Sequence, residues 1–113
     1  MEDAITRQTA ELASLAQNLG ADLVGVADLD LLRGLYTQPA DLLLPFPRGI
    51  SVAVRLADPV MDAILPQDPT AVYAHHYVVV NALIDAITLR LVGHIQRQGY
   101  RALPVHASQQ MGP

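Results

Sequence analysis

Cysteine and lysine are both missing from this 113-residue chain. Without cysteine the chain forms no disulfide bond and no thiolate zinc site. It also holds no iron–sulfur cluster through thiolates of its own, because such clusters need cysteine ligands. Its seven basic residues are arginines scattered along the chain, and eleven acidic residues give a net charge of −4. Nucleic-acid binders present a basic face, so this charge distribution argues against nucleic acid as a partner.

Charged residues are scarce, at 16% of the chain, whereas hydrophobic residues reach 51%. A chain of this length fits one domain with a modest core, so residues 1–113 are expected to form a single domain. The apolar content disfavours disorder. It also predicts that some apolar surface meets a partner, another domain or a second copy of the chain.

We expect no secretory leader at the start of this sequence, because its first residues are acidic where a signal peptide is basic. The most apolar stretch is residues 77–95, and four polar residues interrupt it: Asn81, Asp85, Arg90 and His94. Such residues make a membrane span costly. We therefore expect a soluble protein without membrane contact, and the lack of cysteine fits a cytoplasmic location.

Hydrophobic periodicity predicts six elements in the order α-β-α-β-α-β. Helices are expected over residues 3–19, 31–36, 58–64 and a long stretch from Asp68 to Gln98, which leaves strands at residues 22–27, 50–56 and 100–105. The third and fourth of these helices both lie between the second and third strands and count as one helical element, which gives the six-element order of an α/β fold. The expected architecture is a small three-stranded sheet packed by the N-terminal helix and the long helix.

The long helix is the dominant predicted element. Asp68 followed by Pro69 is a good helix start, since it offers an N-cap acceptor and a preset φ. Its apolar residues recur at helical spacing and form one stripe: Tyr73, Tyr77, Val80, Ile84, Ile87, Leu91 and Ile95. The valine run 78–80 has strand propensity, so a break in the helix there stays open.

Glycines mark the predicted boundaries. Gly20 and Gly99 follow helices and are expected to take the left-handed conformation that ends them. Gly25 lies inside a predicted strand, which indicates close approach of a packed element.

Histidines provide the candidate chemistry. His75 and His76 are neighbours on a helix and point about 100° apart, so they do not converge on one metal. His106 follows the last predicted strand, at the end of a strand where α/β proteins place their sites. Asp85 and Arg90 are expected to be solvated helix-face charges. Neither a phosphate-binding loop nor a nucleophile elbow is present.

Three stretches, taken in order, resemble epoxyqueuosine reductase-like iron–sulfur proteins. Residues 19–27 (Leu-Gly-Ala-Asp-Leu-Val-Gly-Val-Ala) resemble the first strand of that family, and residues 47–54 (Pro-Arg-Gly-Ile-Ser-Val-Ala-Val) resemble its second strand. Residues 73–77 (Tyr-Ala-His-His-Tyr) and 99–105 (Gly-Tyr-Arg-Ala-Leu-Pro-Val) resemble the helix and the strand that follow. The resemblance spans nearly the whole chain and rests on the order and spacing of these stretches.

This resemblance implies a nitroreductase- and reductive-dehalogenase-like N-terminal region that binds cobalamin. In the family, electrons reach the cobalamin from two [4Fe–4S] clusters in a later, cysteine-rich part, which this sequence does not contain. The implied role is a cofactor-binding module that is not catalytically complete alone and works with a cluster-bearing domain or partner. The residues implied for the cofactor cleft are Tyr73, His75, His76, Tyr77 and Asn81 on one wall, and His106, Ser108 and Gln109 on the other.

The chain departs from the family at its implied proton donor. The queuosine enzymes carry an aspartate after the third strand, whereas this sequence reads Val-His-Ala-Ser over residues 105–108. His106 is the implied catalytic residue in its place, because imidazole donates protons near neutral pH.

Two other interpretations stay open. One is a non-enzymatic module derived from the same fold, which dimerises through a sheet edge or the long helix and binds a small ligand or a protein. The high apolar content favours it. The other is a small flavin-binding reductase, which rests on the fold relationship alone.

Overall fold

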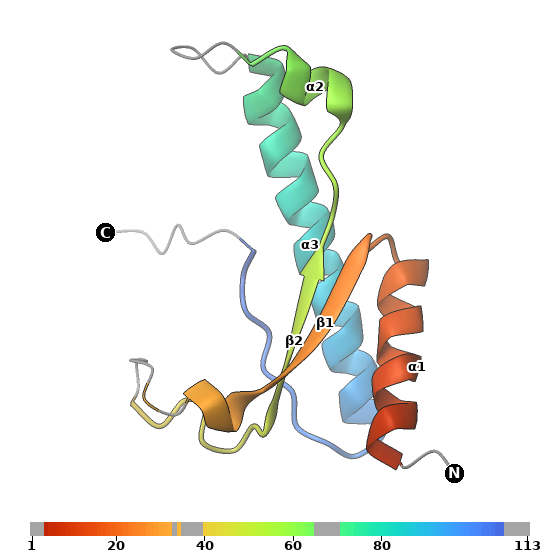
Figure 1. Ribbon diagram of the computed structural model, residues 1–113, viewed down its shortest axis with the longest axis vertical. Coiled ribbons are helices and arrows are strands. Elements are labelled where there is room, and N and C mark those ends of the chain that lie inside the picture. Colours follow the sequence, from red (N-terminus) through yellow and green to blue (C-terminus); the bar gives the residue numbers. More distant parts are fainter. Residues whose placement is uncertain (1–3, 33, 35–39, 65–70, 108–113) are drawn as a thin grey trace.

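The computed structural model describes residues 4–32, 34, 40–64 and 71–107 of the chain (Figure 1). Its elements follow in the order α1 (Ala4–Asn18), β1 (Leu23–Asp28), the 3-10 helix η1 (Leu29–Leu32), β2 (Arg48–Ala53), α2 (Asp58–Asp62) and α3 (Ala71–Arg97). The helices predicted over residues 3–19 and 58–64 and the strands predicted over residues 22–27 and 50–56 are confirmed, with ends that differ by a few residues. The short helix predicted over residues 31–36 overlaps only the end of η1, and most of that stretch lies outside the described residues. The predicted start of α3 at residues 68–69 lies outside the described residues.

β1 and β2 form an antiparallel ribbon in which Val24 pairs with Val52 and Gly25 pairs with Ser51. Because side chains alternate along a strand, the valines and Ile50 share one face, and the small residues share the other. The valine face packs on the core, whereas Gly25 and Ser51 are exposed. A Cβ placed on Gly25 would meet nothing within 4 Å, so the predicted close approach at this glycine is wrong.

The predicted third strand is also wrong. Residues 101–106 form no strand, and the sheet that the described residues build has two strands, not three. Pro104 lies in the middle of this stretch and has no N–H to give to a ladder. The three-stranded α/β sheet packed by two helices, with its nitroreductase- and reductive-dehalogenase-like topology, is therefore replaced by a two-stranded ribbon. Residues 101–107, here called the wall segment, run in extended form beside it (Figure 1).

The core is small and lies where α1, α3 and the ribbon meet. Its buried residues are Ala16, Ala21, Ile87 and Leu91, and Ile87 is only 1% exposed. Residues with partly buried side chains pack around them: Leu12, Leu15, Leu19, Val24, Ile50, Val52 and Val54. Both helices contribute residues three or four apart along the chain, which places each set on one helix face.

α3 runs without a break through the valine run at residues 78–80, so the break left open there does not occur. Its predicted apolar stripe includes both of its buried residues, Ile87 and Leu91, and that stripe is confirmed as the face toward the core. The upper half of α3 extends beyond the ribbon and has α2 beside it (Figure 1). By length and composition alone, α3 is also apolar enough to cross a membrane, and little of it is buried.

Two glycines end helices as predicted. Gly20 follows α1 with φ of 121°, and Gly99 follows α3 with φ of 93°. Both values lie in the region that side chains other than glycine rarely adopt. After Gly20 the chain turns at once into β1, because the N–H of Ala21 donates back to the carbonyl of Ala16 over 3.0 Å. This turn sets the position of the ribbon against α1.

Candidate functional site

Two adjoining cavities lie between β2, the last turns of α3 and the wall segment. Their volumes are about 290 Å³ and about 470 Å³. They share five lining residues, which are Phe46, Arg48, Ile50, Ile95 and Arg101. We call the two cavities together the groove.

The floor of the groove is apolar because the inner face of β2 and one face of α3 both turn apolar side chains toward it. Ile50 and Val52 are two apart in β2 and so share its inner face. Leu91 and Ile95 are four apart in α3 and so lie one turn above the other. All four line the smaller cavity, which Leu103 and Val105 of the wall segment close from the other side, although both remain partly exposed.

Two arginines give the groove its charge. Arg48 begins β2 opposite Asp28, and its Nη1 lies 3.7 Å from Oδ1 of that carboxylate. Arg101 comes from the wall segment, 53 residues later in the sequence. Among the described residues, none of those that line the smaller cavity carries a carboxylate. Arginine guanidinium groups bind carboxylates and phosphates through paired N–H donors, so this cavity suits an apolar molecule with an anionic end.

The opening of the larger cavity is lined by both acidic and basic or neutral polar side chains. Nε2 of His94 lies 3.2 Å from Oε1 of Glu11, and the Gln98 side chain donates to the same oxygen over 3.4 Å. These contacts join α1 to α3 across 83 residues of sequence. They also place a carboxylate at this mouth, so the smaller cavity is the better place for an anion.

Asp85 holds the wall segment in place. The N–H of Ala107 donates to Oδ1 of Asp85 over 2.8 Å, and this contact is partly buried. Asp85 is therefore no solvated helix-face charge, and that prediction is wrong. The wall segment forms no ladder with β2, and this hydrogen bond fixes its far end to α3. Asp85 thus positions one side of the groove.

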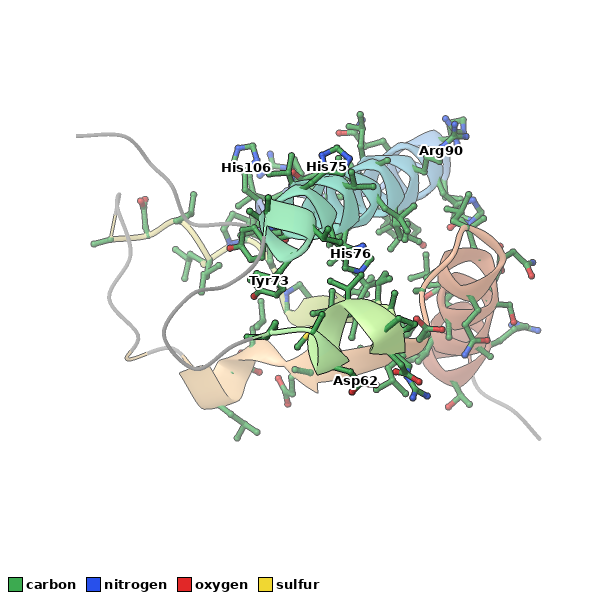
Figure 2. All side chains as sticks on the ribbon, turned by 90° about the horizontal axis from the view of Figure 1, so that it is seen from above. Asp62, Tyr73, His75, His76, Arg90 and His106 are labelled. Carbon is green, nitrogen blue, oxygen red and sulfur yellow. The ribbon has the colours of Figure 1, made fainter. Side chains whose placement is uncertain are left out.

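The residues proposed for the first cofactor wall are spread around α3. Tyr73 and Tyr77 lie together, with ring centroids 6.2 Å apart. His76 points toward α2, where its Nε2 accepts the N–H of Ala57 over 3.1 Å. His75 points away from α2 and the strands (Figure 2). Asn81 is half-buried. None of these five residues lines either cavity of the groove.

The second proposed wall does not face the first. His106 is exposed and directly precedes Ala107, whose N–H donates to Asp85. Asp85 follows His75 by ten residues in α3, so the two lie about 15 Å apart along the helix axis. Ser108 and Gln109 lie outside the described residues. A corrin ring needs both walls around one space, so the described residues do not fit cobalamin by themselves.

Sequence reasoning missed the two arginines of the groove. Their signal was weak, since each stands alone in an apolar stretch and the two are far apart along the chain. Only the fold brings them together. The sequence signal that could have identified them is an isolated arginine next to strand-like residues, which is compatible with a position in a groove beside a strand.

Comparison of the chain with protein-family models, with curated proteins and with solved structures gives no match. The resemblance to epoxyqueuosine reductase-like proteins therefore stays a prediction.

Proposed function

We propose that this chain is a ligand-binding module that holds an apolar molecule with an anionic end in the groove. Catalytic redox chemistry, if the module serves a reductase as its resemblance implies, belongs to protein outside this chain. The observation that carries the proposal is the smaller cavity, where the described lining residues combine two arginines with apolar side chains and include no carboxylate.

Each part of the lining has a distinct task in this proposal. The apolar floor removes the hydrocarbon part of the ligand from water, which contributes about 25 cal/mol per Å² of apolar surface. Arg101 supplies the main attraction for the anionic end. Arg48 is partly neutralised by Asp28, which also orients its guanidinium. The wall segment covers the bound ligand from the open side.

The test compares two eight-carbon probes by isothermal titration calorimetry. Octanoate carries the carboxylate, and 1-octanol offers a similar chain without the charge. We expect octanoate to bind about fivefold more tightly, because a charge-assisted hydrogen bond at a partly exposed site contributes about 1 kcal/mol. Arg101→Gln should remove most of this difference and leave the affinity for 1-octanol unchanged.

Arg7→Gln is the matched control. Arg7 is exposed on α1 and lines neither cavity, so its loss changes the net charge equally without touching the groove. Equal affinities of the wild-type chain for the two probes would overturn the proposal. An equal effect of both substitutions would overturn it too, since the attraction would then come from net charge and not from the site.

A second proposal is that the chain contributes one wall of a cobalamin site that a cluster-bearing partner completes. It is supported by the order of the family-like stretches and by the Tyr73–Tyr77 pair, of which Tyr77 is 45% exposed. In this proposal the tyrosines, His75 and Asn81 of α3 contact one side of the cofactor, and the partner supplies the facing wall. Cobalamin would supply a reducible cobalt centre.

Titration of the folded chain with hydroxocobalamin, followed by visible absorption, tests this second proposal. Saturable binding near one cofactor per chain that Tyr77→Ala weakens and His106→Ala leaves unchanged would support it. Binding that Tyr77→Ala does not affect would contradict the assigned wall. If cobalamin does not bind at high micromolar concentration, this chain alone does not hold the cofactor.

A further inference from the structure

α3 has a second apolar face, which no described part of the chain covers. Val72, Val79 and Leu89 on this face are 61%, 49% and 64% exposed. Ala82 and Ala86 lie between them and are exposed as well. The face points away from α2 and the strands, on the side where Figure 2 places His75 and Arg90. A helix that is apolar on opposite faces is usually covered on both.

The spacing of this face is that of a coiled coil. Its residues follow one another at alternating steps of three and four, namely Val72, His75, Val79, Ala82, Ala86, Leu89 and Gly93. In heptad terms, Val72, Val79, Ala86 and Gly93 occupy positions a, and His75, Ala82 and Leu89 occupy positions d. The buried residues Ile87 and Leu91 fall at positions b and f, on the opposite side. We call the seven residues the outer stripe.

The Arg97 side chain packs against Gly93. Glycine inside a helix costs about 1 kcal/mol relative to alanine. The nearest atoms that a Cβ there would meet belong to the flexible guanidinium of Arg97, at 3.2 Å. On the outer stripe the exposed residues Ala82 and Ala86 are the small ones that permit a second helix to approach closely.

We propose that two copies of this chain pair through the outer stripe, with their α3 helices parallel and in register. The pairing buries Val72, Val79 and Leu89 against the same residues of the second copy. Val78 flanks the stripe at a g position with 63% exposure and adds to the apolar surface that the pair buries.

Charge selects the parallel arrangement. In a parallel pair, position g of one helix meets position e′ five residues further along the other helix. Asp85 is a g position and Arg90 is the e position five residues later, so the two-fold pair forms this contact twice. In an antiparallel pair, position g faces g′ and position e faces e′. Asp85 of one copy then forms no ion pair with Arg90 of the other. Asp85 can hold the wall segment as well, because a carboxylate accepts several hydrogen bonds.

Sedimentation equilibrium at tens of micromolar tests the pairing directly. We expect a mass of twice the 12.2 kDa of one chain. Ala86→Glu should give a monomer, because it places two carboxylates against each other at the centre of the stripe. Glutamate favours helix and Ala86 is exposed, so this variant keeps its fold. A wild-type monomer, including one that instead binds phosphatidylcholine vesicles, overturns the proposal.

Disulfide cross-linking tests the register. Because the chain has no native cysteine, any disulfide must form between the introduced cysteines. Ala82→Cys and Ala86→Cys are made separately and oxidised. Both should form disulfide-linked dimers, since each position faces its own copy in a parallel pair. Ser14→Cys, exposed on α1, is the control that should not. The parallel register is overturned if neither stripe variant cross-links more than this control. It is also overturned if only one of the two stripe variants does so.

The charge pair is tested by Arg90→Glu, which sets two carboxylates together on each side of the pair. We expect dimerisation to weaken about five- to tenfold, since exposed ion pairs contribute little individually but the contact occurs twice. Arg7→Glu makes the same change of charge on α1 and should have little effect. An equal effect of the two variants would contradict the Asp85–Arg90 contact.

Discussion

Replacing Asp85 by alanine should release the wall segment while α3 and the core stay folded. The hydrogen bond from Ala107 to this carboxylate is 2.8 Å long and partly buried. Hydrogen bonds to charged groups contribute about 1.5 kcal/mol or more, so its loss should raise the open population of the segment about tenfold. The side chains that hold the segment otherwise are weak anchors, since Leu103 and Val105 are 41% and 63% exposed.

Amide hydrogen exchange measured by NMR follows this opening residue by residue. The amide of Ala107 should exchange about tenfold faster in Asp85→Ala, because exchange of an amide reports its local opening. The amide of Leu91, in the buried part of α3, should keep its rate. Asp85→Asn is the matched variant, since its side-chain oxygen can still accept the bond, and it should show a smaller effect. Unchanged exchange of Ala107 in Asp85→Ala would refute the anchoring role.

Two further predictions concern stability. Ile87→Ala should lower the free energy of unfolding by about 3 kcal/mol, because it opens a cavity at the most buried large side chain, whereas Leu31→Ala at an 84% exposed position should change it little in the same urea titration. His76→Ala should cost about 1 kcal/mol, since it removes the acceptor of the backbone N–H just before α2. His75→Ala is its control, and equal losses for the two histidines in thermal melts would contradict the contact with α2.

The sequence predicted the helices well because their signals are local. The spacing of Ile87 and Leu91 marks the core face of α3, and Gly20 and Gly99 mark helix ends through their backbone freedom. The wall segment was mistaken for a strand because its apolar alternation is strand-like. A strand also needs a partner with free ladder groups, and Pro104 works against that pairing.

The candidate site was predictable only in small part. The polar residues of the first half of α3 are conspicuous along the chain, yet the helix turns His75 and His76 to different sides (Figure 2). The groove depends on Arg48 and Arg101, which meet through the packing of the ribbon, α3 and the wall segment. The local sequence pattern does not show which distant residues come together in space. The two arginines could therefore be identified as site residues only from the fold.

The core described above has a consequence for the order in which the protein is made. Ala16 and Ala21 emerge early during synthesis, whereas Ile87 and Leu91, which complete the core, emerge some seventy residues later. Throughout that interval α1 exposes Leu12, Leu15 and Leu19 without the helix that covers them. The ribosome adds about 5–20 residues per second, so the interval lasts several seconds. The nascent chain is therefore a natural client for chaperones until α3 has left the exit tunnel.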